Sequence, residues 1–495
     1  MASLIRSTTK TSEDAVLYGN PKMTHFKKVF MKKRNYTAQY LKLTKKTEDI
    51  HFGKKNITIQ IPNAGDLLGG IYLDFKLKNL ERINNYTDID LNEDTSKEAR
   101  FTSYVNGIGY NIINTVELWI GGTKIQTLTG ELIYMLNELH SDYNKSQHFY
   151  TMTNYHNDFT VGKTNTAGRS NNTSVRCQLP IPFFFSKNPG QYLPLCNLED
   201  VLIELKISLK TFDECIVRKY NNFDNSKILC SGLNGYNNIS GSLSPSGEVP
   251  SQYNKYIEPL KNVHVDSANK STVDQGMNMI NSFDVFTRVI YLEPEEALFF
   301  KSKSKLQYLV DIFHIGIPEE IHNPNAITTY TTIIDSNHPT KYLYWTLQRK
   351  DVHDDRHYQN YTFEHLAKYG NGNTTPDTTK HLLNTIKVKL DGIALFEDID
   401  PVIISNIMKY DHFKGPSNES LYIYNASFNP DDAEPSGSVN YSSYHNKIFE
   451  YTISQDAIDQ LNINNTDISI LFRYYVAYFN VFEVVTKSGA NLIYT

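Results

Sequence analysis

Alternation of apolar and polar residues with a period of two is the dominant pattern along this chain. The segments "NITIQIP", "YLDFKLK", "VLIELKISL" and "TIKVKL" each place an apolar side chain at every second position. Successive side chains of a β-strand point to opposite faces of a sheet, so these segments are expected to be half-buried strands. The pattern therefore predicts antiparallel sheets with one face on a core and the other in water.

Two short segments have the period of an amphipathic helix instead, "TGELIYMLNELH" and "DPVIISNIMKY". The apolar positions at helical spacing are Leu132, Met135, Leu136 and Leu139 in the first, and Ile404, Ile407 and Met408 in the second. Thr129 is a suitable N-cap for the first helix, and Pro401 suits the first turn of the second.

These two helices belong to an internal repeat. The first follows "VELWIGGTKIQTL" and the second follows "IKVKLDGIALF", and each of these predicts a strand, a tight turn and a short strand. The turns Gly121-Gly122 and Asp391-Gly392 have hairpin chemistry, because glycine tolerates positive φ. A second pair, "PFFFSKNPGQYLPL" and "ASFNPDDAEPSGSV", combines an aromatic strand end with a Pro-containing bend. Two correspondences in the same order predict a duplication, with two related β domains in tandem.

Long polar stretches separate the predicted strands. The Asn-rich regions 84–100, 141–174 and 351–380 are expected to be loops, and region 214–278 a linker or external excursion. Loops of this length usually serve binding or assembly. Many short strands joined by large loops favour a β-sandwich, and a jelly roll accommodates such loops well.

Composition narrows the class of protein. A chain of 495 residues predicts two or more domains, and a net charge of −5 argues against a dedicated nucleic-acid binder. The four cysteines form no C-x-x-C pair, so buried free thiols in a reducing compartment are expected. Neither a secretory h-region nor an apolar run of membrane-spanning length is visible, which predicts a soluble protein made in the cytosol.

Enzyme motifs are absent from the sequence. It contains no phosphate-binding G-x-x-x-x-G-K-[ST], no dinucleotide fingerprint, no H-E-x-x-H and no G-x-S-x-G. His353 and His357 in "HDDRH" have the spacing of zinc ligands on a helix, but the flanking residues lack an apolar stripe and favour a solvated loop. No cofactor or metal site is therefore predicted.

The Ser/Gly-rich stretch "NPDDAEPSGSVNYSSYHN" resembles a phosphate or nucleophile loop at first sight. A phosphate loop needs a helix N-terminus and a nearby lysine, whereas here Lys447 comes ten residues after Gly437 and opens a strand pattern. His445 is close in sequence, but a turn that flanks a strand is the plainer account. The stretch is predicted to be structural.

The basic segment "KMTHFKKVFMKKR" leaves two alternatives open. Its candidate contact residues are Lys27, Lys28, Lys32, Lys33 and Arg34. They could meet nucleic acid, an anionic membrane surface or an acidic protein. Alternatively, the lysines lie on the wet side of an edge strand, where they discourage unwanted pairing.

Several blocks together resemble the major capsid proteins of nucleocytoplasmic large DNA viruses. In chain order they are "YGNPKMTHFKKVFMKKRNYT", "YVNGIGYNIINTVELWIGGTKIQTLTGELI", "LPIPFFFSKNPGQYLPLCNLEDVLIELKI", "YLEPEEALFF", "NHPTKYLYWTLQ" and "LYIYNASFNPDDAEPSGSVNYS". The last block is the most specific, and "LEPEEA" departs from the family pattern by lacking its arginine. Signature positions carried over from the family are Gly19, Asn20, Pro21, Pro182, Pro194, Leu195, Trp345, Pro435, Ser436, Gly437, Asn440 and Ser442.

The resemblance implies an all-β tandem double jelly roll, two eight-stranded antiparallel sandwiches with short helices and long loops. We expect an N-terminal arm at 1–24, a first jelly roll at 25–213, a linker at 214–278 and a second jelly roll at 279–495. The resemblance also implies a homotrimeric, pseudo-hexagonal capsomer in an icosahedral shell around an internal membrane. Expected partners are neighbouring capsomers, minor capsid and penton proteins, and possible membrane contacts through the N-terminal segment, with no specific nucleic acid. Assembly is expected in the host cytoplasm.

Two alternatives stay open at this point. A scaffold protein of the same fold would be absent from the mature particle. A carbohydrate-binding or hydrolytic β-sandwich would show an aromatic-lined site with paired carboxylates, and no such pair stands out in the sequence.

Overall fold

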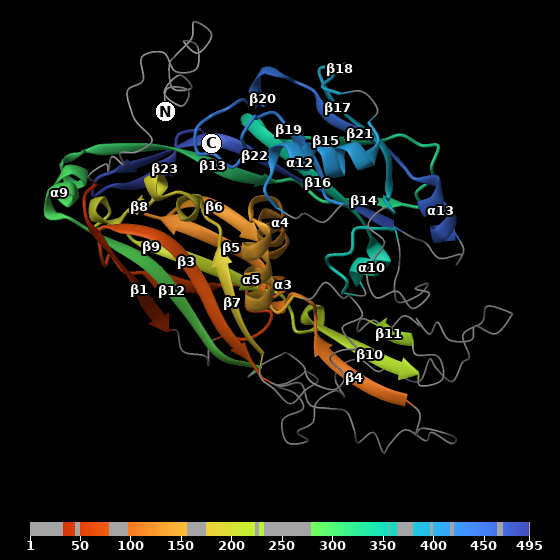
Figure 1. Ribbon diagram of the computed structural model, residues 1–495, viewed down its shortest axis with the longest axis horizontal. Coiled ribbons are helices and arrows are strands. Elements are labelled where there is room, and N and C mark those ends of the chain that lie inside the picture. Colours follow the sequence, from red (N-terminus) through yellow and green to blue (C-terminus); the bar gives the residue numbers. More distant parts are fainter. Residues whose placement is uncertain are drawn as a thin grey trace, which may run out of the picture. The chain divides into compact units, whose positions relative to one another are not determined.

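The computed structural model describes residues 33–44, 50–78, 98–155, 175–222, 227–231, 279–354, 356–363, 380–396, 399–415, 420–462 and 469–494. The described residues from Thr37 onward form one compact unit. Strands dominate this unit (Figure 1).

Two antiparallel sheets form a first sandwich. Sheet 1a has the strand order β1-β12-β3-β7, and β8 pairs with the start of β3. Sheet 1b has the order β2-β9-β5-β6. The strand bounds are β1 Tyr36–Thr44, β2 Ile57–Ile61, β3 Leu67–Leu77, β5 Ile113–Ile120, β6 Thr123–Thr129, β7 Val175–Ile181, β8 Leu193–Pro194, β9 Ile203–Leu209 and β12 Ile280–Leu292.

A second sandwich repeats this arrangement. Sheet 2a has the order β13-β22-β16-β19, β20 pairs with the start of β16, and β14 and β23 pair with β22. Sheet 2b has the order β15-β21-β17-β18. The strand bounds are β13 Lys305–Ile315, β14 Glu319–His322, β15 Tyr330–Ile333, β16 Pro339–Arg349, β17 Leu383–Leu390, β18 Ile393–Ala394, β19 Tyr422–Asn425, β20 Val439–Asn440, β21 Lys447–Ile453, β22 Ser469–Val485 and β23 Gly489–Leu492.

Apart from the additional strands β14 and β23, the two sandwiches have the same strand order, which confirms the predicted duplication. Both predicted hairpin turns have two consecutive residues with positive φ, 57° and 81° at Gly121-Gly122 and 48° and 84° at Asp391-Gly392. The second predicted pair of segments also occupies one place in both halves. β8 pairs with Leu67 and Leu68, and β20 pairs in the same way with the first two residues of β16.

Strand β12 belongs to the first sandwich, although the expected boundaries assigned residues from 279 onward to the second. It pairs with β3 over most of its length, with Val285 opposite Leu73. Its equivalent in the second sandwich is β22, which pairs with β16 and places Tyr474 opposite Trp345. The polypeptide thus returns to complete the first sandwich before it begins the second, and sequence spacing alone does not reveal this return.

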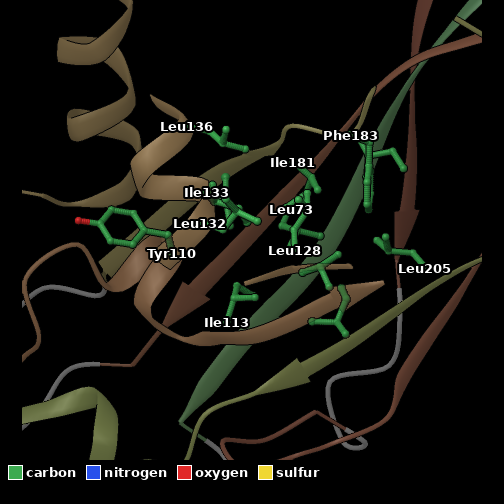
Figure 2. Close-up of a cluster of buried hydrophobic side chains, with 14 of the residues drawn as sticks. Leu73, Tyr110, Ile113, Leu128, Leu132, Ile133, Leu136, Ile181, Phe183 and Leu205 are labelled. Carbon is green, nitrogen blue, oxygen red and sulfur yellow. The ribbon is translucent and has the colours of Figure 1, made fainter. Parts of the chain in front are cut away.

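The core of the first sandwich lies between sheets 1a and 1b (Figure 2). Leu73 of β3, Leu205 of β9 and Leu128 of β6 are fully buried there, as the period-two pattern predicts. Helix α4 adds Leu132 and Leu136 from its buried face.

The helices and the remaining strands are short. Their bounds are α3 Ile108–Asn111, α4 Gly130–His140, α5 Tyr143–Thr153, α7 Phe184–Lys187, η3 Pro189–Gln191, η4 Leu195–Asn197, η5 Asp213–Cys215, α9 Pro294–Ser302, α10 Lys350–Asp354, the π-helical η8 Ile403–Ile407, α12 Met408–His412, η9 Tyr441–Ser443 and α13 Gln455–Asn462. A further sheet has the order β11-β10-β4, from Lys227–Ser231, Ile216–Asn222 and Glu98–Tyr104. No helix in the described segments is both long and apolar enough to cross a membrane.

Several predicted loops contain regular structure. Within 141–174, helix α5 is capped by Asp142, whose side chain accepts from Lys145 N, and it buries Phe149 and Tyr150. Within 214–278, β10 and β11 are strands, so this region is not only a linker. Within 351–380, α10 is helical and 358–363 is buried. Tertiary packing supplies the apolar partners that the polar local sequence does not suggest.

Candidate assembly interface

The bend after β19 contains the Ser/Gly-rich stretch and is held by its own side chains. Ser436 Oγ lies 2.6 Å from Ser427 Oγ and accepts a hydrogen bond from Asn429 N at 2.9 Å. Gly437 has φ 138°, and a Cβ at this position would lie 2.5 Å from Ala426 O. Only glycine fits this backbone without strain, and Ser436 is used in the turn.

The end of the bend is capped by an asparagine. Asn440 Oδ1 accepts hydrogen bonds from Ser442 N at 3.1 Å and from Ser442 Oγ at 2.8 Å, at the start of η9. His445 lies apart from these serines, and its backbone N donates to Asp391. Pro435 precedes Ser436 and, with Gly437, lies in the chain segment between β19 and β20, which both pair with β16.

The matching bend of the first sandwich contains three further predicted signature positions. Pro182 follows β7, Pro194 is the last residue of β8 and pairs with Leu67, and Leu195 begins η4. Asn188 Oδ1 accepts a hydrogen bond from Gly190 N at 2.9 Å, so this bend is also closed by an asparagine side chain.

The two tryptophans lie in different sandwiches. Trp345 on β16 is fully buried in the second core, where its ring centroid lies 5.3 Å from that of Phe449 on β21. Trp119 on β5 is half-buried, and Lys206 Nζ lies 3.7 Å from its ring centroid. The signature position Trp345 thus joins sheets 2a and 2b.

The predicted N-terminal positions are mostly outside the described residues. Gly19, Asn20, Pro21, Lys27, Lys28 and Lys32 are among these undescribed positions. Lys33 and Arg34 are described, and both are exposed.

The two histidines of "HDDRH" are not in a simple solvated loop. His353 lies in helix α10, where its ring packs edge-on against Tyr358, and burial lowers its pKa. His357 is half-buried after the helix. In the part of the chain that the structure describes, no group of three or more His, Cys, Asp or Glu side chains could hold a metal ion.

Three of the four cysteines can be placed. Cys177, Cys196 and Cys215 are buried with free thiols, as the sequence predicts for them.

Helix α4 forms the centre of a contact between the two sandwiches (Figure 1). Glu131 in its first turn accepts hydrogen bonds from Tyr475 OH at 2.9 Å and Tyr361 OH at 3.1 Å. Arg473 Nη2 lies 3.0 Å from Glu131 Oε1 and donates to Gln348 at 2.5 Å. Burial acts to lower the pKa of Arg473, but Glu131, Tyr475 and Tyr361 together outweigh it, and the pKa is raised. A charge-paired network therefore fastens sheet 2a to the first sandwich.

The other end of α4 carries a second polar contact. His140 Nδ1 lies 2.5 Å from Asp431 Oδ1, and its Nε2 lies 2.8 Å from Tyr342 OH. Burial lowers the pKa of His140, against the opposing hydrogen bond to Asp431. Leu139 O accepts from Gly415 N at 2.9 Å. A Cβ on Gly415 would lie 1.8 Å from Glu138 O, so this close approach requires glycine.

Aromatic side chains fill the rest of the contact. Phe184 lies against Phe482 of β22, with ring centroids 4.8 Å apart. Lys187 Nζ lies 5.1 Å from the Phe313 ring centroid. One hydrophobic cluster runs from the first core through Tyr344 and Tyr475 on the outward face of sheet 2a.

This contact between the sandwiches is not predicted by the sequence pattern. A signal was present, because "YLYW" in β16 and "FRYYVAYF" in β22 lack the alternation of a half-buried strand. Strands buried on both faces have near-continuous apolar runs. The sequence does not say which partner covers the second face.

Known capsid proteins are similar to this chain in both of its halves. A family model described as the N-terminus of major capsid proteins matches residues 24–257. A second model, described as the large eukaryotic DNA virus major capsid protein, matches residues 301–490. The chain is 22% identical to the probable capsid protein 4 of Acanthamoeba polyphaga mimivirus, covering 96% of each chain. It is also 22% identical to the major capsid protein of Paramecium bursaria Chlorella virus 1, over 97% of this chain and 96% of the relative.

Solved structures show the same fold. A chain of the PBCV-1 virus capsid is similar with a TM-score of 0.66 and 19% identity, covering 95% of this chain and 100% of the other. The Faustovirus major capsid protein is similar with a TM-score of 0.58 and 12% identity, over 97% and 96% of the two chains. The duplicated sandwich is thus a double jelly roll. The chain belongs to the family of major capsid proteins of large eukaryotic DNA viruses.

Proposed function

We propose that this chain is the building block of an icosahedral virus shell, in which three copies form a pseudo-hexagonal capsomer and capsomers tile the surface. Like its relatives, it is a structural protein and not an enzyme. The observation that carries the proposal is the tandem of two sandwiches with the same strand order. Three such tandems supply six similar units, and a heterologous contact that repeats around a ring can close it.

The shell requires further contacts beyond the capsomer. We propose neighbouring capsomers and minor capsid and penton proteins as partners, with synthesis and assembly in the host cytoplasm. The basic segment ending at Lys33 and Arg34, both exposed, is proposed to lie on the inner face, near an internal membrane or its proteins.

The proposed division of the chain follows the strand pairing. The arm covers 1–24, and the first jelly roll covers 25–213 together with β12. Residues 214–278 connect these parts, and the second jelly roll extends from α9 onward. The signature positions in the two bends are proposed to shape matched corners of the two sandwiches.

Light scattering on the purified chain tests the proposal. The expected mass is three times 56.8 kDa, and negative-stain images should show a hexagonal outline. A stable monomer or dimer at micromolar concentration would contradict the capsomer. Proteomics of mature particles separates a shell component from an assembly scaffold of the same fold, which would be missing from them.

A further inference from the structure

Helix α9 exposes two large apolar side chains where it joins β12 of the first sandwich to β13 of the second. Leu298 is 65% exposed and Phe299 is 56% exposed. Glu295 and Ser302 are exposed too, three or four residues from this pair, so all four side chains lie on one side of the helix. We call these four residues the α9 face. Exposed apolar side chains that are contiguous and rimmed by polar residues mark interaction sites, whereas isolated ones do not.

The other side of α9 is fixed to both sandwiches. Asn197, fully buried in η4 of the first sandwich, donates from Nδ2 to Phe300 O at 2.8 Å and to Thr486 Oγ1 at 3.0 Å. Thr486, in the turn after β22 of the second sandwich, donates from Oγ1 to Lys303 O at 2.6 Å. The C-terminal turn of α9 is therefore held in one orientation, and a partner that binds the α9 face does not have to order it first.

Charge is distributed along α9 with opposite signs at its two ends. Three glutamates precede the apolar pair and three lysines follow it, namely Glu293, Glu295 and Glu296, and Lys301, Lys303 and Lys305. Lys301 forms an ion pair with Glu199, at 2.7 Å. Lys305 forms another with Glu483, at 2.6 Å. Lys303 lies beside the α9 face, because its Nζ is 4.9 Å from the Phe299 ring centroid. An apolar centre between an acidic end and a basic end is complementary to its own reversed copy.

We infer that α9 docks antiparallel on α9 of a second copy of this chain, about a two-fold axis between Leu298 and Phe299. In this pairing Leu298 of one copy lies opposite Phe299 of the other. Glu295 of each copy lies opposite Ser302 of the other and next to its Lys303. The apolar pairs cover one another, and a carboxylate meets an ammonium group at both ends of the contact. The same residues serve on both sides, as in any isologous interface.

The two-fold symmetry determines which copies meet. This inference rests on the proposed capsomer, in which three copies are related by a three-fold axis. Three equivalent copies cannot be divided into pairs, so the two docked helices belong to different trimers. The α9 contact therefore joins neighbouring capsomers.

The α9 contact is small. Two apolar side chains from each copy bury far less than the roughly 1,200 Å² of a stable protein interface. A single α9 pair is accordingly weak, and trimers should remain separate in dilute solution. Every copy in a trimer presents its own α9, so many weak contacts act together once a lattice begins to form.

A cysteine near the proposed axis tests the contact directly. Concentrated trimers of the variant Leu298→Cys, treated with a short bismaleimide, should give a two-chain band on a denaturing gel. In size-exclusion chromatography without denaturant, the linked chains should elute ahead of the trimer. The control Ile327→Cys, which replaces a side chain 94% exposed on the loop before β15, should give no such band. Wild type reports any reaction of the native cysteines.

Charge exchange separates this contact from a purely local role of the charges. Glutamates near the start of α9 and lysines near its end also stabilise the helix itself through its dipole. In the Leu298→Cys background, Glu295→Lys and Lys303→Glu each place like charges opposite one another. At low salt each should therefore reduce the cross-linking yield about tenfold. An equimolar mixture of the two variants brings opposite charges together in mixed pairs and should recover most of the yield. A role confined to the dipole predicts no recovery.

Light scattering on every variant provides the control for folding, and each should remain trimeric because the changed side chains are exposed. A wild-type chain that is not trimeric would overturn the proposed capsomer together with this inference. Three results would overturn the inference alone: trimers that do not cross-link through Leu298→Cys, cross-links confined to one trimer, and no recovery in the mixture.

Discussion

Replacement of Glu131 by glutamine tests whether the polar network at α4 fastens the two sandwiches. The variant Glu131→Gln keeps the side chain's size and one acceptor oxygen for the tyrosine hydroxyls. It removes the negative charge 3.0 Å from Arg473, whose side chain is 11% exposed. Breaking a buried ion pair by removing one partner costs about 3–5 kcal/mol, and partial exposure of the glutamate reduces the expected loss to about 2–3 kcal/mol.

Urea unfolding followed by tryptophan fluorescence measures this loss. A Trp119→Phe background leaves Trp345 as the only indole, because the chain has two tryptophans. All samples need one protein concentration, since assembly adds to apparent stability. Arg473→Met and the double variant complete a mutant cycle, with an expected coupling of about 2 kcal/mol. Coupling within about 0.5 kcal/mol of zero would refute the role assigned to the ion pair.

Three further predictions address the bend, the histidine and the basic segment. Gly437→Ala should destabilise the protein by about 1–3 kcal/mol in thermal unfolding, because φ is 138° and the new Cβ would lie too close to Ala426 O. The control Gly190→Ala should be near neutral, because its Cβ would lie 3.5 Å from the nearest atom. The pKa of His140 is lower in the folded protein than in the unfolded chain, so on acidification this histidine is protonated in the unfolded chain at a higher pH. Stability should therefore fall as the pH drops below about 6.5. His140→Gln should flatten that slope in denaturation curves, and an unchanged slope would count against it. Deletion of residues 1–34 should leave trimers intact by light scattering but impair shell assembly in electron micrographs; lost trimers or normal shells would contradict the inner-face role.

Local chemistry was sufficient to predict much of the fold. The Thr129 cap, both hairpin turns and the matched bends depend on residues close in sequence, and the structure has all of them. The helix predicted in "DPVIISNIMKY" (residues 400–410) is present, but it contains a π-helical turn, and Ile407 is exposed and not part of the core. Helix α5 was missed because its sequence is mostly polar, and its apolar residues find their partners only in three dimensions.

The contact between the sandwiches could not be predicted from the sequence, for a different reason. Glu131 and Arg473 are ordinary charged residues in the sequence, and only the fold makes them neighbours. The membership of β12 in sheet 1a likewise depends on pairing between strands far apart in the chain. The family resemblance predicted the double jelly roll correctly, but not which side chains join its halves.

The cover that sheet 2a provides for α4 has a consequence for synthesis on the ribosome. The first half emerges before the strands that cover it, so Glu131 on α4 and Phe184 lack their partners Tyr475 and Phe482 until β22 has been made. During that interval the nascent chain exposes an aromatic surface to solvent. Partly folded chains with exposed apolar surface are prone to aggregation and misassembly. At high expression the yield of soluble protein should therefore depend on host chaperones that shield the first half while translation of the second is completed.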